Sequence, residues 1–318
     1  MNLLPFLPAH RLALQPEEHR WLVDGLWGEQ AVGIIGGEPK CCKSFLALDL
    51  AVAVASGTPC LRRYAVTRSG PVLLFAAEDA LPVVRQRIEG ISRAAGVAME
   101  QLDVQVITAP RLRLDIGDDV QRLANTVDSL HPRLLVLDPF VRLHRRDENA
   151  SADVAPLLDL LRQMQRQYEI AVLLVHHAKK GGGNVRAGQA LRGSSEFHAW
   201  GDSLLYLRRQ GETLMLSAEH RAAPSIDGIA LRLRTDDEHF ALEVVSSPPP
   251  AQPVPSLPVP ERIRQVLAAA PGPLAMTQLR EACRIRKVTL CQALATLTQE
   301  GELLRTVGGG YQLAQRPT

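Results

Sequence analysis

A lysine and a serine follow an apolar run near the start of the chain, at the spacing that phosphate binding uses. The segment GGEPKCCKSF, residues 36–45, meets the pattern G-x-x-x-x-G-K-[ST] with Gly37, Lys43 and Ser44, but Cys42 stands at the second glycine. In such loops backbone N–H groups surround the phosphates, the lysine neutralises their charge, and the hydroxyl coordinates magnesium. A small side chain in the second glycine position reduces the fit without removing a charge. The segment therefore predicts a site for ATP and Mg²⁺ with nine nucleotide-binding residues: Gly37, Glu38, Pro39, Lys40, Cys41, Cys42, Lys43, Ser44 and Phe45.

Polar residues end three further apolar runs of the chain. Glu78 and Asp79 close VLLFAAED, Asp138 closes LLVLD, and His176 and His177 close AVLLVHH. Ligands bind beyond the carboxyl ends of parallel strands, so these residues are expected near the nucleotide. The acidic pair is placed to activate water, although a solvated turn is the alternative. Asp138 is suited to hold magnesium through a water molecule, and Ser44 is expected to coordinate the same ion with its hydroxyl. One histidine is expected to sense the γ-phosphate and the other to be structural, and the sequence does not decide which.

Apolar runs of strand type alternate with helical segments along most of the chain. Near-continuous Val, Leu and Ile in short runs between helices indicate a parallel sheet covered on both faces. Beyond residue 200, four runs in succession indicate antiparallel strands that extend the sheet. The predicted fold class is α/β, a RecA-like ATPase core with a mostly parallel sheet and antiparallel C-terminal strands, followed by a small winged-helix domain. The expected boundaries are 1–245 for the core with a lead-in over 1–30, 246–260 for a linker, and 261–318 for the small domain.

Composition and charge narrow the class of protein. The chain has 318 residues, of which 46% are hydrophobic, enough for one large and one small core. No apolar stretch reaches the length of a membrane span, and the N-terminus lacks a basic start and a cleavage site, so we expect a cytoplasmic protein. The five cysteines lack metal-type spacing. Cys41 and Cys42 are either reactive, because a helix N-terminus lowers the pKa of a thiol, or ordinary small residues in a reducing compartment.

Two segments favour contact with nucleic acid. The stretch 178–200 holds three consecutive glycines among the candidate DNA-binding residues Lys179, Lys180, Arg186 and Arg192. Flexible cations suit a phosphodiester backbone, although a solvated loop is the alternative. After a linker with seven prolines in fifteen residues, positions 261–318 carry eight Arg or Lys against four Asp or Glu. Three short helices and a two-stranded wing are expected there, typical of a winged helix that either binds DNA or docks a protein.

As an ordered set, these motifs resemble a known family over roughly residues 20–245. The segments GIIGGEPKCCKSFLALDLAVAVASG, VLLFAAEDA, LLVLDPFVRLHRRDENAS, VLLVHHAKK and RGSSEFHAWGDSLLYLRR are similar to the AAA_25 or RepA-type family. This is the plasmid replicative helicase branch of the RecA-like ATPases, related to DnaB-type helicases. The resemblance implies that Lys43 and Ser44 bind phosphate and magnesium, that Glu78 is the catalytic carboxylate, and that Asp138 supports the metal. It also implies that either histidine fills the sensor position and that 192–195 match a DNA-side motif.

The resemblance further implies assembly and function. Family members are ring hexamers in which an arginine from the neighbour completes each ATP site. In SAEHRAAP this arginine is Arg221, and Glu219 stands where related rings often have a lysine. The expected function is a hexameric replicative DNA helicase of a plasmid or mobile element, acting on single-stranded DNA, with replication or recombination partners bound through 261–318. The alternative is an ATP-switched, DNA-binding regulatory protein without helicase activity. Cys42 and Glu219 depart from the family pattern and allow a slow or specialised ATPase.

Overall fold

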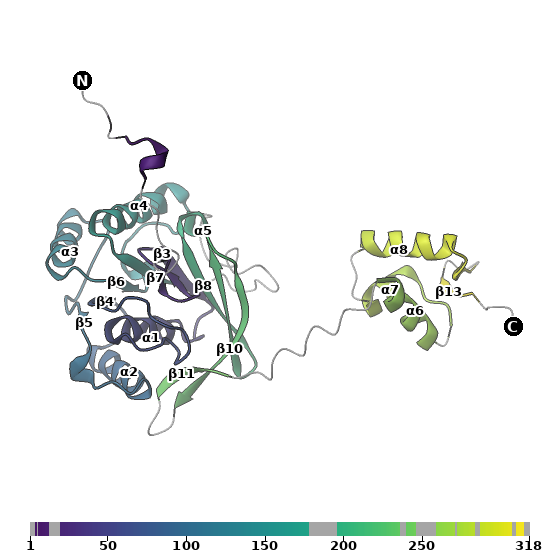
Figure 1. Cartoon of the computed structure of the whole chain (residues 1–318), viewed down its shortest axis with the longest axis horizontal. Helices are drawn as coiled ribbons and strands as arrows, with labels where there is room; N and C mark the ends of the chain where they lie inside the picture. The colour runs from purple at the N-terminus through teal and green to yellow at the C-terminus, as the bar shows by residue number, and fades with distance from the viewer. Residues whose placement is uncertain are drawn as a thin grey trace. The chain divides into compact units, whose positions relative to one another are not determined.

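The computed structural model describes residues 4, 6–12, 20–177, 196–235, 240–245, 259–270, 272–283, 287–306 and 310–314 (Figure 1). The chain divides into two compact units, Met1–Ser246 and Ser247–Thr318, and each is described by itself. Within the described ranges, no helix combines the length and the apolar character that a membrane crossing requires.

The first unit is built on one large sheet. Over the described residues it has nine strands in the order β11-β10-β9-β8-β3-β7-β6-β4-β5. The strands from β8 to β5 in this order are parallel, and β9, β10 and β11 continue the sheet in antiparallel fashion. The bounds are β3 (Val32–Gly37), β4 (Val72–Ala76), β5 (Val104–Val106), β6 (Leu134–Asp138), β7 (Ala171–His177), β8 (Ser203–Gln210), β9 (Thr213–His220), β10 (Ile226–Thr235) and β11 (Phe240–Val244).

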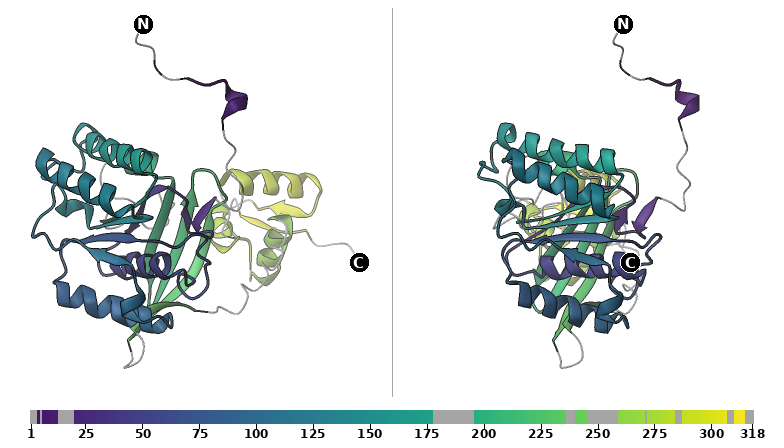
Figure 2. Two further views of the ribbon diagram at one scale, coloured as in Figure 1. Left: turned by 60° about the vertical axis from the view of Figure 1, so that its left-hand side comes forward. Right: turned by 90° about the vertical axis from the view of Figure 1, so that its left-hand side faces the viewer.

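Helices cover both faces of this sheet, which gives three layers (Figure 2). On one face lie α1 (Lys43–Ser56) and α2 (Leu81–Ala94), and on the other lie α3 (Gly117–Leu130), α4 (Ser151–Tyr168) and α5 (Glu196–Trp200). The helix α1 packs against the sheet, including its strand β11, and against α2. It is therefore apolar on all sides, and 11 of its 14 residues are buried. It ends at Gly57, whose φ of 76° is the left-handed conformation that closes many helices.

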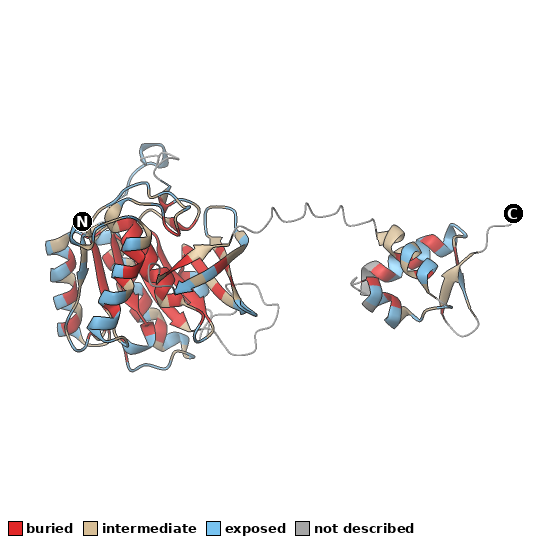
Figure 3. Ribbon diagram, turned by 90° about the horizontal axis from the view of Figure 1, so that it is seen from below, coloured by how far each residue is buried: buried red, intermediate tan, exposed pale blue. Residues whose placement is uncertain are grey.

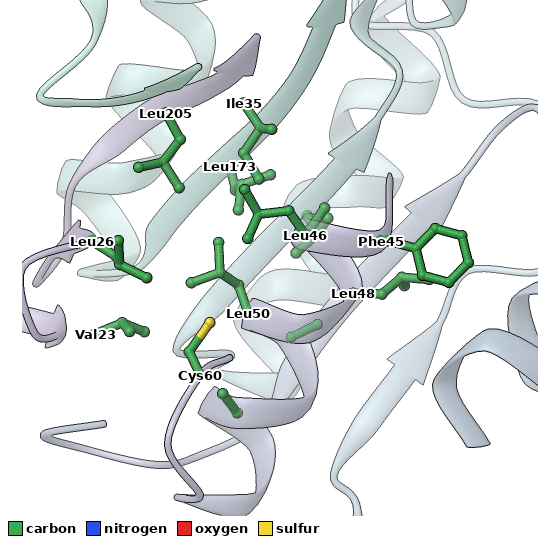
Figure 4. Close-up of a cluster of buried hydrophobic side chains, with 14 of the residues drawn as sticks. Val23, Leu26, Ile35, Phe45, Leu46, Leu48, Leu50, Cys60, Leu173 and Leu205 are labelled. Atoms are coloured by element: carbon green, nitrogen blue, oxygen red, sulfur yellow. The ribbon is translucent and has the colours of Figure 1, made fainter. Parts of the chain in front are cut away.

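Alternating residues of each central strand enter two separate cores. In β7, Leu173 and Val175 pack with α1, whereas Val172 and Leu174 pack with α4 on the opposite face. Burial on both faces explains the unbroken apolar runs of the sequence. The buried residues lie on the strands of the sheet and on the helix faces that cover it (Figure 3). On the α1 face, Leu46, Leu50, Ile35, Leu173 and Leu205 gather between helix and sheet (Figure 4). Each fully buried leucine contributes about 2 kcal/mol by removal of its apolar surface from water.

The predicted core fold is confirmed, including the four consecutive strands after residue 200. Each of the four is antiparallel to the next, as expected, and the first of them, β8, also runs parallel to β3. The sequence did not predict a hairpin of β1 (Trp21–Val23) and β2 (Trp27–Gly28). This hairpin lies near the end of the expected lead-in. Its strands are two and three residues long, too short for alternation to show.

The second unit is a small helical body with its own core. Its elements are α6 (Val259–Ala269), α7 (Met276–Cys283), α8 (Lys287–Gln299) and the antiparallel pair β12 (Leu303–Arg305) and β13 (Tyr311–Leu313). Ile263, Leu279 and Leu290 are fully buried between the helices. The helix α6 begins two residues inside the expected linker, with Pro260 in its first turn, where a missing N–H costs nothing. The winged-helix interpretation, with its role, stays a prediction. Arg284 and Arg286, the cations just before α8, lie outside the described residues.

Candidate nucleotide site

The phosphate loop connects the central strand β3 to α1 at the carboxyl edge of the parallel strands. Gly37 is the last residue of β3 and is level with Leu207 of β8 and His177 of β7. A Cβ at Gly37 would lie 2.4 Å from the carbonyl oxygen of Leu207 and 2.7 Å from Sγ of Cys41. The first glycine of the pattern is therefore required by the close approach of β8 and of the loop itself.

Two residues of the loop have left-handed backbone although neither is glycine. Lys40 and Cys42 both have φ of 63°, and Cys42, with ψ of 28°, is the N-cap of α1. Such a conformation costs a non-glycine residue roughly 1–2 kcal/mol. Left-handed residues within a turn direct successive N–H groups into one concavity, which is a common anion site. The second glycine of the pattern is thus replaced by a cysteine that adopts the backbone shape of a glycine.

Lys43 is held inside the loop rather than extended into solvent. Its side chain is 6% exposed, and Nζ donates a hydrogen bond of 2.8 Å to the carbonyl oxygen of Glu38. The Cys41 thiol donates to the same oxygen over 2.8 Å. Burial lowers the pKa of Lys43, while nearby Cys41, Asp138, Cys42 and Glu78 act in the opposite direction. Two of the three acidic residues that the sequence assigns to the site, Asp138 and Glu78, thus act electrostatically on the lysine.

The two cysteines of the loop are poorly suited to nucleophilic chemistry. Burial raises the pKa of Cys41 and of Cys42, and the cations Lys43 and Arg209 only partly offset it. A raised pKa reduces the thiolate fraction, and the thiolate is the reactive form. These environments favour the interpretation of both residues as ordinary small side chains.

Ser44 and Asp138 meet at the expected position for a magnesium ion. Asp138, the last residue of β6, is 9% exposed, and the Ser44 hydroxyl at the start of α1 favours the charged form of its carboxylate. Burial raises the pKa of Asp138 to about 6, with Asp79 and Glu78 adding to the rise and Ser44 opposing it. One hydroxyl and one carboxylate are the hard oxygen donors that Mg²⁺ accepts when phosphates and water complete its shell. The donor set therefore fits the ion.

Glu78 and Asp79 follow β4 and have separate cationic partners. Glu78 Oε1 accepts a hydrogen bond of 2.7 Å from Nε of Arg142, in the short helix η4 (Phe140–Arg142) directly after β6. Asp79 pairs with Arg87 of α2. Only Glu78 is linked in this way to the strand that carries Asp138. Sequence reasoning overlooked Arg142, although its position four residues after Asp138, at a strand end, was a usable signal.

The two histidines at the end of β7 lie on opposite faces of the sheet. His176 is 1% exposed, and its ring stacks on Phe197 at 4.3 Å, on the α4 and α5 face. His177 follows Val175 by two residues, so strand alternation puts it on the face of α1, level with Gly37. The geometry favours His177 as the residue beside the phosphates and His176 as the structural one.

Arg221 lies near the amino ends of the parallel strands, opposite to the ends that carry the phosphate loop. It directly follows His220, the last residue of β9. His220 pairs with Ser203 of β8, and Ser203 pairs with Gly33 of β3. Gly33 lies four residues before Gly37. Four strand residues span roughly 13 Å. Its guanidinium is 57% exposed and pairs with Asp202 at 3.1 Å. Arg221 therefore does not lie beside the phosphate loop of its own chain.

The residues expected to contact DNA are Lys179, Lys180, Arg186 and Arg192, and all four lie outside the described residues. Arg209, near the end of β8, is a second arginine that sequence reasoning overlooked. Its Nη2 donates a hydrogen bond of 3.1 Å to the carbonyl oxygen of Lys40. It is the second arginine of the pair in LYLRRQ, and alternation along β8 was the signal that could have placed it beside the loop.

Comparison with known proteins agrees with this architecture. The AAA_25 family model, described as an AAA domain, matches residues 2–183, more than half of the chain. A DnaB-like replicative helicase, solved for its interactions with primase, is similar with a TM-score of 0.52 and 12% identity over 67% of this chain and 57% of that chain. This likeness shows the fold, and the present chain spans less than two thirds of that helicase.

Two further solved structures have TM-scores of 0.49. One is the RadB recombinase, with 16% identity over 68% of this chain and 91% of that chain. The other is the KaiC-like protein PH0186 from Pyrococcus horikoshii OT3, with 12% identity over 70% of this chain and 93% of that chain. Because the family model spans more than half of the chain, and a RecA-like sheet carries the phosphate loop at its centre, this chain belongs to the AAA_25 family and is a P-loop ATPase of the RecA type.

Proposed function

We propose that this chain is an ATP-driven motor on single-stranded DNA, a hexameric replicative helicase of a plasmid or mobile element. The observation that carries the proposal is the convergence of Lys43, Asp138 and Glu78 at the carboxyl ends of the parallel strands, where they follow or end β3, β6 and β4. A cation for the phosphates, a metal-holding carboxylate and a carboxylate for water are the parts that phosphoryl transfer to water requires.

In the proposed reaction, the loop N–H groups and Lys43 bind the β and γ phosphates of ATP. Ser44 and Asp138 hold Mg²⁺, which when bound neutralises charge on the phosphate oxygens. Glu78 orients a water molecule for in-line attack on the γ-phosphorus and accepts its proton. His177 lies beside the loop and reports the presence of the γ-phosphate to β7. These roles rest on residue types and on their positions at the strand ends.

The placement of Arg221 supports assembly into a ring. An exposed arginine at the edge opposite the loop serves catalysis only in a neighbouring subunit, where it stabilises the charge of the transition state. We propose a homo-hexamer in the cytoplasm, with DNA contacts from Lys179, Lys180, Arg186 and Arg192. The second unit, with its surplus of basic residues, is the proposed binding site for DNA or for replication or recombination proteins.

One observation favours a second candidate function, an ATP-switched DNA-binding regulator without helicase activity. Cys42 places a side chain where the pattern has glycine, and its strained backbone suits a loop that binds nucleotide more than one that turns it over rapidly. In that case the ATPase controls assembly and the second unit recognises DNA.

The rate of ATP hydrolysis by the full chain, with and without single-stranded DNA, separates the two functions. A motor is expected to be stimulated at least about tenfold, because DNA engagement is coupled to turnover in every cycle. Unwinding of a forked duplex and electron-microscope images with an ATP analogue complete the test. Rings that hydrolyse ATP at one rate with and without DNA, and that leave the fork paired, would establish the regulator instead.

A further inference from the structure

Arg209 is the one arginine of β8 that lies on the same face of the sheet as the phosphate loop. Leu205 and Leu207 of this strand pack with α1, and Arg209 continues their alternation. Because Leu207 is level with Gly37, Arg209 extends beyond the end of β3, beside the loop. Its neighbour Arg208 falls on the opposite face, where its charge acts on Tyr206.

Arg209 acts on the two residues of the loop that have left-handed backbone. Its Nη2 donates to the carbonyl oxygen of Lys40 at 3.1 Å. Its charge partly offsets the rise that burial causes in the pKa of the Cys42 thiol. Lys40 and Cys42 share a φ of 63°. One side chain from another strand therefore holds the first strained position of the turn directly and acts on the second through its charge.

The contact with Lys40 fixes the direction of a peptide group. In a trans peptide the C=O and the following N–H point in opposite directions. An arginine that holds the Lys40 carbonyl from the side of β8 therefore directs the Cys41 N–H away from β8. A guanidinium suits this task because its donors lie in a rigid plane, which fixes the direction of the hydrogen bond that it gives.

We propose that Arg209 is a positioning residue that holds the turn from Lys40 to Cys42 in its phosphate-binding shape and so compensates for the missing glycine. The inference rests on the proposed binding of ATP at this loop. Without Arg209, the left-handed cysteine relaxes and the N–H groups must be reordered when nucleotide binds. The expected defect is in nucleotide affinity, because Arg209 braces the loop and does not touch the reacting atoms.

The first experiment measures the dissociation constant of ATP, together with kcat and KM, for Arg209→Ala in the full chain. We expect affinity to fall about tenfold and KM to rise accordingly, as for the loss of a hydrogen bond from a charged group, with kcat within about twofold of wild type. Arg208→Ala is the matched control, with the same charge removed one residue away on the other face. It should bind ATP as wild type does.

The second experiment is a double-mutant cycle with Cys42→Gly. Glycine adopts the left-handed conformation without strain, so the turn no longer needs its brace. In the Cys42→Gly background, Arg209→Ala should weaken ATP binding by less than about threefold, a clear departure from additivity. A purely electrostatic contribution of Arg209 to the phosphates would persist in full in this background and would overturn the proposal.

Equal ATP affinity of wild type and Arg209→Ala would also overturn the proposal, as would the same loss in Arg208→Ala. These outcomes are distinct from a failure of the proposed function. If wild type itself binds no ATP, the loop is not a nucleotide site. If wild type binds ATP and Arg209→Ala binds it equally well, the site stands and only the role of Arg209 is lost. Thermal unfolding of each variant verifies that the protein remains folded.

Discussion

Arg142 donates a hydrogen bond of 2.7 Å to Glu78, so the carboxylate that we propose to orient water already has a cationic partner. The two residues follow neighbouring strands, Glu78 after β4 and Arg142 after β6. Their side chains are 44% and 60% exposed, and an ion pair with that exposure stabilises the fold by at most about 1 kcal/mol. Glu78 can therefore exchange this partner for water at little cost.

Glu78→Gln is expected to retain ATP binding and to lose hydrolysis by at least about 10²-fold, because the amide cannot accept the proton of the attacking water. Equilibrium binding and single-turnover hydrolysis measure the two steps separately. Arg142→Ala is the control, since it breaks the pair and keeps the carboxylate, and it should still hydrolyse ATP. Normal hydrolysis by Glu78→Gln would assign the water to another residue.

Cys42→Gly is expected to raise stability by about 1 kcal/mol and to preserve or increase the affinity for ATP. The glycine removes a side chain near the phosphates and relieves the left-handed strain at this position. Denaturant unfolding and a nucleotide titration measure the two effects. A clear loss of affinity would mean that the thiol itself contributes to binding, and sensitivity of the ATPase to oxidants would then be the next measurement.

The stability of the chain without nucleotide and metal should depend on pH through Asp138. Its pKa is about 6 in the fold against 3.8 for an ordinary aspartate, so the folded state binds the proton more tightly. The resulting stabilisation is complete below the ordinary pKa and is lost as the pH rises through 6. Between about pH 5 and about pH 7, wild type should lose about 1 kcal/mol relative to Asp138→Asn. Parallel curves for the two proteins in the presence of a chelator would contradict the raised pKa.

The sequence predicted the parts of the site that depend on a single strand end or loop. Asp138 was identifiable because a carboxylate that closes an unbroken apolar run needs a partner, and Ser44 favours its charged form. The left-handed backbone of Cys42 was not identifiable, since the pattern records only that glycine is replaced. Contacts between elements distant in sequence, such as Arg142 with Glu78, depend on the order of the strands and not on local spacing.

The packing and pairing of strands explain two points that the sequence left open, the faces of the two histidines and the position of Arg221. His176 and His177 are adjacent in a strand and so lie on opposite faces, but only the packing of β7 shows which of them faces α1. Arg221 could be proposed as an arginine finger from a motif, but its place at the edge opposite Gly37 follows from the antiparallel course of β9. For the four cations of 178–195, the expected DNA contacts remain predictions.

Arg221→Ala should leave ATP binding within a few-fold of wild type and reduce turnover by about 10³-fold, the scale of arginine fingers. Mixing Arg221→Ala with Lys43→Ala subunits should restore part of the activity, because a mixed ring contains interfaces with an intact loop on one side and an intact arginine on the other. Subunit exchange is verified by labelled subunits. Absence of recovery in rings that exchange, or full DNA-stimulated turnover by a monomer, would exclude a finger in trans at this position.

The most direct test of the central claim is the ATP turnover of Lys43→Ala in the presence of single-stranded DNA, with thermal unfolding followed in parallel. Lys43 is the buried cation of the loop, and its amine donates hydrogen bonds to the carbonyl oxygen of Glu38 at 2.8 Å and to the thiol of Cys41 at 3.9 Å. We predict that DNA-stimulated turnover falls at least about 10²-fold while the thermal transition is preserved. Turnover at the wild-type rate by a folded Lys43→Ala protein would show that this loop is not the site of ATP hydrolysis.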